Sequence, residues 1–267
     1  MEIPPKDGTT TLQIPLVSAE RVGPTRVSED ATSTFAPIKR FLNRYFYFSM
    51  SLLLTALVVW GFSRTVNDNL FHAVPPRPFL LWIHGAAFSA WMAFFIAQST
   101  LVRIHRVNWH RFLGWFGVGL AAVMVPLGIA IAIIMARFDA VQLHQSGTDA
   151  FLAIPFYGII AFGVIIAVAI FWRKKPEFHR RLIFIATCGL MDAPLDRFDF
   201  LFDHNLGFLC VDLLIALGVV RDLVVDRRIH KVYGYALPAV IIGQSLAMYL
   251  WRSDPSWWRT TTHAILG

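Results

Sequence analysis

The histidines are the residues whose positions most clearly indicate chemistry, and the chain has nine of them. Three share one local setting: His110, His179 and His230 are each followed by a basic residue and then by an apolar run. Neutral imidazoles ligate haem iron and transition metals, so three of them at one depth could hold either group. A histidine beside a basic residue is also an ordinary anchor at a membrane edge, and that interpretation stays open.

His84 differs from these three because it lies inside an apolar run, about five residues from its outer end. An ionisable side chain at that depth is costly and is a candidate for function. The alternative is a neutral imidazole that is hydrogen-bonded to a neighbouring helix. The candidate cofactor ligands are therefore His84, His110, His179 and His230.

A second candidate site is acidic. Four carboxylates are spaced 4, 3 and 4 residues apart, as on one face of a helix: Asp192, Asp196, Asp199 and Asp203. Asp212 is expected at a depth similar to that of Asp196 and His84. Carboxylates at such a depth must be protonated, paired or bound to a cation. We therefore expect His84, Asp196 and Asp212 to form a proton path or a metal site. The alternative is an ion-pair network of Asp196, Arg197 and Asp212 that only holds two helices together.

Seven apolar runs would position these residues, each close to the roughly 20 residues that cross a bilayer as a helix. They cover residues 45–62, 79–102, 112–136, 150–172, 182–201, 206–224 and 232–251. The fifth run contains Asp192, Pro194, Asp196 and Arg197, which favours a broken helix or a half-span. In this arrangement Cys188 and Cys210 lie more than about 10 Å apart in depth, too far for a disulfide.

The composition agrees with a membrane protein. Of 267 residues, 56% are apolar and only 15% are charged, against about 25% charged in soluble domains. The sequence predicts an all-α, polytopic membrane bundle of seven transmembrane helices. Residues 1–40 are expected to be a disordered cytosolic tail, 41–252 the transmembrane domain and 253–267 a short outer tail. Trp251, Trp257 and Trp258 are expected to anchor that tail at the outer interface.

The basic residues predict the orientation. Eighteen of the 24 Lys and Arg fall on one side, in the tail and in the loops after the second, fourth and sixth runs. The positive-inside rule then gives an N-in, C-out topology. The net charge of +7 is explained by contact with anionic lipid headgroups, and nucleic acid is not an expected partner.

Several motifs resemble those of known families. They are His84-Gly-x-x-Phe-x-x-Trp-Met-x-x-Phe-x-x-Gln, Arg106-x-x-x-His110-Arg-x-Leu-Gly, Pro176-Glu-x-His179-Arg-Arg-Leu and Arg228-x-His230. Over roughly residues 79–257 the chain resembles a group of uncharacterised bacterial seven-span membrane proteins with the His-Arg-x-Leu-Gly signature. It is more distantly similar to four-histidine proteins of cytochrome oxidase assembly and to cytochrome b561-like proteins. That similarity implies haem or copper handling by the four histidines.

Three functions follow as hypotheses. The first is a redox or cofactor-handling protein that binds haem b or a transition metal through its histidines, with other membrane redox proteins as partners. The second is a proton-coupled carrier that uses His84, Asp196 and Asp212. The third is a non-catalytic subunit or scaffold of a membrane complex, without a cofactor. The common motifs of soluble enzymes, such as the phosphate-binding glycine loop or Gly-x-Ser-x-Gly, are absent from the sequence.

Overall fold

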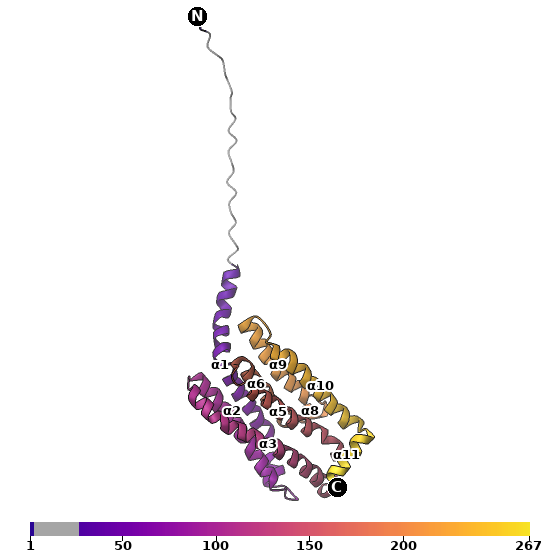
Figure 1. Ribbon diagram of the computed structural model, residues 1–267. Helices are drawn as coiled ribbons and strands as arrows, with labels where there is room; N and C mark the ends of the chain where they lie inside the picture. Colours follow the sequence, from indigo (N-terminus) through magenta and orange to yellow (C-terminus); the bar gives the residue numbers. More distant parts are fainter. Residues whose placement is uncertain (3–26) are drawn as a thin grey trace. The chain divides into compact units, whose positions relative to one another are not determined.

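A computed structural model describes the backbone of residues 1–2 and 27–267 (Figure 1). The described residues divide into two units, Met1–Ile38 and Lys39–Gly267, and the helix bundle belongs to the second. Most of the disordered tail expected over residues 1–40 lies outside the described residues. Helix α1 (Val27–Ser63) begins within that expected tail. The sequence there has acidic residues just after Val27, a composition that favours the first turn of a helix.

Within residues 27–267, five helical segments are long and apolar enough to cross a membrane, as a multi-pass membrane protein requires. They are Ala36–Ser63 of α1, α2 (Leu80–Arg103), α3 (Val107–Gln142), the pair α4 (Thr148–Phe151) and α5 (Ala153–Phe171), and α10 (Lys231–Ser253). Each overlaps one of the apolar runs predicted from the sequence. A single π-helical turn, η1 (Asn67–Phe71), lies between α1 and α2.

The fifth and sixth predicted runs do not form apolar helices of membrane length as the other five do. The fifth is broken into α6 (Pro176–Cys188), α7 (Asp192–Leu195) and α8 (Asp199–Asp203), with extended backbone at Phe198. Pro194 and the adjacent charged residues account for the break, since proline cannot donate to a helical hydrogen bond. The sixth is continuous as α9 (Gly207–Asp226), but its charged residues keep it out of the five apolar segments.

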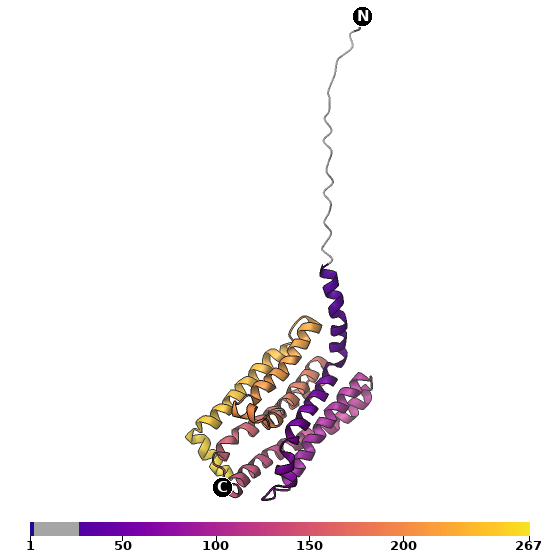
Figure 2. The ribbon, with the colours of Figure 1, turned by 180° about the vertical axis from the view of Figure 1, so that it is seen from behind.

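The helices of the second unit lie side by side and share one core (Figures 1 and 2). The most extensive contacts join α2 to α3, α3 to α5, and α5 to both α6 and α10. Fully buried side chains come from most of these helices: Leu54, Trp91, Met124, Phe162, Phe184 and Ile215. Cys188 is buried and Cys210 half-buried, and both are free thiols, as the sequence predicted.

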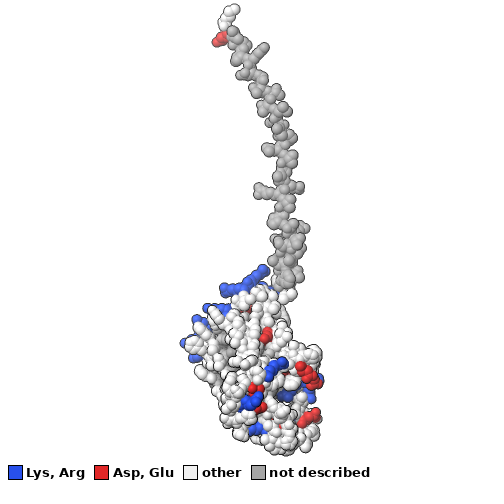
Figure 3. All heavy atoms as spheres, turned by 90° about the vertical axis from the view of Figure 1, so that its right-hand side faces the viewer, with Lys and Arg blue, Asp and Glu red and all other residues white. Residues whose placement is uncertain are grey.

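The two ends of the bundle differ in charge. One end, here called the basic end, contains the loops that join α2 to α3, α5 to α6 and α9 to α10. The other, here called the far end, contains the loops that join α3 to α4 and α10 to α11 (Ser256–Leu266). Figure 3 shows Lys and Arg gathered toward the upper part of the visible face, with acidic and basic atoms mixed lower down.

The C-terminal residues form a docked helix rather than a loose tail. Helix α11 packs against α3 and α4. The indole N–H of Trp258 donates to the carbonyl of Ala150 at 3.3 Å, and this side chain is buried. The guanidinium of Arg137 donates to the carbonyl of Ile265 at 2.7 Å. The interfacial role expected for Trp258 is therefore corrected: the folded-back helix buries it, while Trp257 stays exposed.

Candidate functional site

Two of the predicted histidines meet at the basic end. His110 lies in the first turn of α3 and His179 in the first turn of α6, and both are half-buried. Their ring centroids are 6.4 Å apart, with the ring planes at 80°. The side-chain amide of Gln98, on α2, donates to the carbonyl of His110 at 3.3 Å. Three helices therefore fix the position of this imidazole pair.

The hydrogen bonds of the two rings leave nitrogen atoms available. The Nδ1 atom of His179 lies 2.9 Å from the carbonyl oxygen of Ala169, which can only accept, so Nδ1 carries the hydrogen. In the neutral ring the lone pair is then on Nε2. The Nδ1 atom of His110 is buried and has no hydrogen-bond partner within the described part of the chain. Gly114, one turn beyond His110, faces open space.

The distance between the two rings is compatible with a metal centre held between two imidazoles. Since metal–nitrogen bonds are about 2.0–2.1 Å long, two rings on opposite sides of one ion have centroids roughly 6 Å apart. The described residues contain no group of three or more His, Cys, Asp or Glu that could hold a bare ion. Haem iron needs only an axial pair, because the porphyrin supplies its other four nitrogens. The residues present therefore fit haem better than an isolated ion.

The rings of the other two histidines contact different neighbours. His230 caps α10, where its Nδ1 accepts a hydrogen bond from the N–H of Val232 at 3.3 Å. Its ring packs edge-on against Phe178, with centroids 4.8 Å apart. Burial and the charge of Arg181 lower the pKa of His230, while Asp222 opposes them.

His84 lies near the opposite end of α2 and packs its ring on Phe88 at 4.1 Å. Its Nδ1 is buried without a partner among the residues described. His84 precedes Gln98, the neighbour of His110, by 14 residues, which is about 21 Å of helix. The four histidines proposed from the sequence therefore do not converge.

The acidic candidates also have different neighbours. Asp196 lines a pocket at the far end, whereas Asp212, on α9, lies beside Gln244. No ion pair or hydrogen bond joins His84 to either carboxylate in the described segments. The expected acidic stripe is interrupted because extended backbone at Phe198 separates α7 from α8.

A buried charge network at the basic end was missed by the sequence analysis. Arg181, on α6, donates to both carboxylate oxygens of Asp222, on α9, at 2.8 and 2.7 Å. Arg221 donates to Asp222 at 2.9 Å and to Asp226 at 2.8 Å. It also donates to the side-chain oxygen of Asn43, on α1, at 3.0 Å. Charged side chains that are fully buried are normally paired in this way.

Two of these arginines had been assigned to the lipid-facing charge of the cytosolic side. That interpretation is corrected for Arg181 and Arg221, which are buried inside the bundle. The sequence signal was present, since Glu177, Asp222 and Asp226 are acids within otherwise basic segments. Burial raises the pKa of Glu177, but the hydrogen bond from Arg181 and the charge of Arg180 outweigh it and hold that pKa below its usual value.

The fold and the site together define a membrane-type helix bundle with two imidazole rings in contact at its basic end. No protein-family model, no curated protein and no solved structure matches the chain. The carbonyl of Ala169 sets the orientation of the His179 ring.

Proposed function

We propose that this chain is a haem-binding membrane protein with a redox or cofactor-handling role, in which His110 and His179 are the axial ligands. The observation that carries the proposal is the contact between the two rings, whose centroids are 6.4 Å apart and whose planes lie at 80°. The hydrogen bond from His179 Nδ1 to Ala169 supports it, because metal-ligating histidines usually donate their second ring N–H to a carbonyl or carboxylate.

The protein's contribution would be to orient the two rings. The bond to Ala169 fixes the tautomer and the plane of His179, and Gln98 holds the backbone of His110. When bound, haem would supply one-electron chemistry at the edge of the membrane.

The decisive experiment is a reduced-minus-oxidised visible spectrum of the purified chain, with elemental analysis of the same sample. We expect a Soret band with sharp reduced α and β bands and stoichiometric iron. His110→Ala and His179→Ala should each abolish or shift these bands. The exposed His144 provides the matched control, and His144→Ala should leave the spectrum unchanged.

Two results would contradict the proposal. One is a folded, colourless preparation with no iron after expression with a haem precursor. The other is full retention of the bands in the His110→Ala and His179→Ala variants. Stoichiometric copper or zinc without haem bands would also reject haem, since it would mean that the pair serves a bare ion.

We further propose seven crossings with the N-terminus inside, in a bacterial inner membrane. The five apolar segments support this, together with α6–α8 as a broken fifth crossing and α9 as the sixth. The excess of Lys and Arg at the basic end would then face the cytosol and its anionic lipid headgroups.

Cysteine labelling tests this orientation in intact cells. In a background of Cys188→Ala and Cys210→Ala, a membrane-impermeant maleimide should label Ser146→Cys, in the α3–α4 loop. It should label Lys174→Cys, in the α5–α6 loop, only after permeabilisation. The reverse pattern would mean that the basic end faces outward.

A further inference from the structure

Acids balance the positive charge of the basic end on one side of the bundle but not on the other. On the side of α6 and α9, arginines are neutralised inside the buried charge network. On the side of α3 and α5 the chain has no Asp or Glu in residues 69–138 or 150–176. The next acid, Glu177, already pairs with two arginines of α6. Cations at this end of α3 and α5 therefore need a partner from outside the chain.

Two of these cations are neighbours of one exposed tryptophan. Trp115, on α3, is 65% exposed. Arg111 precedes it by four residues, so the two side chains share a helix face with Cβ atoms about 5–6 Å apart. Arg173, in the loop after α5, holds its guanidinium over the Trp115 ring, 5.9 Å from the centroid. The exposed indole thus brings together cations from two segments of the chain.

Both guanidiniums have donors to spare. Arg111 and Arg173 are exposed, and neither forms an ion pair with any residue that the structure describes. Arg173 donates one N–H to the carbonyl of Ile170 at 3.3 Å. The planar forks of arginine match the oxygen atoms of a phosphate, and the indole N–H of Trp115 is a further donor.

Aromatic side chains beside these cations are left uncovered by the bundle. Phe112 and Phe116, on α3, and Phe171, at the end of α5, are 73%, 58% and 73% exposed. Exposed aromatic rings next to basic residues are typical of the headgroup level of a bilayer. A ligand that covers this surface therefore has an anionic group for the arginines and an apolar part for the rings.

We propose that Arg111, Trp115 and Arg173 bind the phosphate headgroup of one anionic phospholipid, whose acyl chains lie along Phe112 and Phe116. Basic sites between the ends of membrane helices bind such headgroups. This inference rests on the proposed placement of the basic end at a membrane surface, and not on haem. It differs from a general attraction of basic loops to anionic lipid, because it requires arginine at two particular positions.

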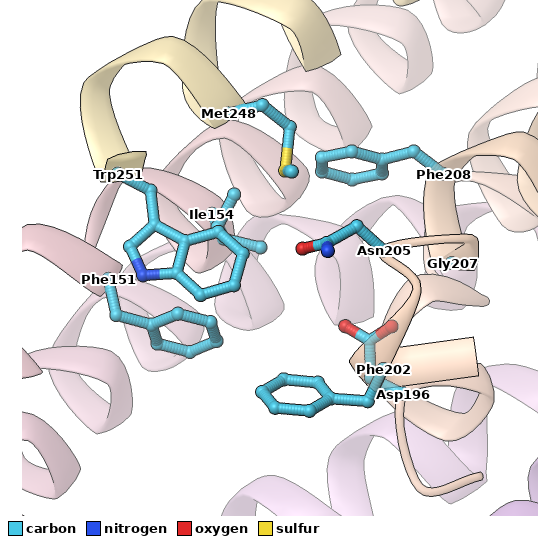
Figure 4. A pocket seen from close by; sticks show the side chains of 9 residues that line it. All are labelled: Phe151, Ile154, Asp196, Phe202, Asn205, Gly207, Phe208, Met248 and Trp251. Atoms are coloured by element: carbon cyan, nitrogen blue, oxygen red, sulfur yellow. The ribbon is translucent and has the colours of Figure 1, made fainter. Parts of the chain in front are cut away.

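The far end offers no comparable ligand site. Figure 4 shows its pocket, in which aromatic rings surround Asn205 and Asp196. The enclosed part of that pocket has room for little more than one water molecule. The positive charge of Arg197 also acts on the carboxylate of Asp196 already. Unmatched charge and accessible surface occur together at the basic end.

The first test counts the lipids that the chain retains. The full chain is purified in mild detergent, freed of native lipid and equilibrated with equal amounts of phosphatidylglycerol and phosphatidylcholine that have the same acyl chains. Native mass spectrometry should show one phosphatidylglycerol per chain, preferred at least about tenfold over phosphatidylcholine. Equal retention of the two lipids would overturn the proposal. Displacement of the lipid by added inorganic phosphate would also overturn it, since the site would then serve a free anion.

Charge-conserving variants separate a defined site from diffuse attraction. Arg111→Lys and Arg173→Lys keep the positive charge but lose the planar fork, so each should lower phosphatidylglycerol retention at least about threefold. Arg228→Lys is the matched control, at an exposed position in the α9–α10 loop, and should retain the lipid fully. Full retention in both Arg111→Lys and Arg173→Lys would overturn the proposal. If a variant does not fold, the comparison of the two lipids on the unmodified chain still decides it.

Extraction of membranes with alkaline carbonate distinguishes the two ways in which the inference can fail. Release of the chain from the membrane would refute the proposed membrane placement and this lipid site with it. A chain that stays in the membrane but shows no preference for phosphatidylglycerol would refute the lipid site alone.

Discussion

The guanidinium of Arg181 and the carboxylate of Asp222 form a two-point ion pair inside the bundle, and their side chains are only 1% and 0% exposed. The pair joins α6, a short segment of the broken fifth run, to α9, whose charges exclude it from the most apolar helices. Arg221 extends the contact to Asn43, on α1. Polar contacts thus join α6, α9 and α1 at the basic end of the bundle.

Removal of one partner of this pair should destabilise the fold strongly. In Asp222→Ala, the buried Arg181 and Arg221 lose their shared acceptor, and an unpaired buried charge costs about 3–5 kcal/mol. We expect a loss of that size in the free energy of unfolding, measured by denaturant titration in detergent. The double variant Arg181→Met with Asp222→Leu should recover part of the loss, because it buries one fewer unpaired charge.

An exposed ion pair provides the control. Arg259 pairs with Asp254 at 2.6 Å, but its side chain is 57% exposed. Water screens such pairs, so Arg259→Ala should change stability by no more than about 1 kcal/mol. Similar losses in the two variants would mean that burial does not determine the importance of the Arg181–Asp222 pair.

Stability should also depend on pH through His230. Burial and Arg181 lower the pKa of His230 below its ordinary value of 6.5. The neutral ring therefore contributes stability above that value, and this contribution is lost as the pH falls through it toward the lower pKa of the folded state. Protonation of Nδ1 would also remove the acceptor that caps the N–H of Val232. We expect the unfolding temperature to fall between about pH 7.5 and 5.5.

His230→Asn tests this dependence, because asparagine caps helices well and does not titrate in this range. The variant should have a flatter profile of unfolding temperature against pH than the unmodified chain. His144→Asn, at an exposed position, should keep the original profile. An unchanged pH profile in His230→Asn would show that another group is responsible.

The sequence predicts where the helices lie better than it predicts which helices contact one another. Each of the five apolar helices overlaps a predicted run, because length and hydropathy are local properties that the sequence states directly. The common position of His110 and His179 at helix starts was also visible. The rings of His110 and His179 contact each other, whereas His230 packs on Phe178. Which rings meet depends on how each helix is rotated and which helix it contacts.

The missed features are those that depend on distant contacts. Arg181 and Asp222 are 41 residues apart in sequence. Taken alone, each resembles an ordinary charged residue at a membrane edge. The acidic spacing predicted one helical face, yet backbone extension at Phe198 breaks it. Trp258 resembles an interfacial anchor until α11 folds back onto α4.

Two adjacent tryptophans in α11 should have very different effects. Trp258 is 9% exposed and donates to the carbonyl of Ala150, whereas Trp257 is 59% exposed. Trp258→Ala should leave a cavity and an unpaired carbonyl, with a loss of about 3–5 kcal/mol. Trp257→Ala should change the free energy of unfolding little. Proteolysis of the C-terminus gives a second measurement, since only Trp258→Ala should expose α11 to cleavage; equal resistance in both variants would contradict docking through Trp258.

A pair of glycine substitutions tests the contact between α1 and α7. Gly61 faces the backbone carbonyl of Pro194 so closely that a Cβ atom would overlap it, and backbone cannot turn aside as a flexible side chain can. Gly61→Ala should therefore cost about 1–3 kcal/mol through overpacking. Gly119, within α3, has no atom within 4 Å of the place a Cβ would take. Gly119→Ala should be neutral or stabilising, because alanine favours helix by up to about 1 kcal/mol. If Gly61→Ala were equally well tolerated, α7 would have to move away from α1 at little cost, and the Asp192–Leu195 segment would not be fixed against the bundle.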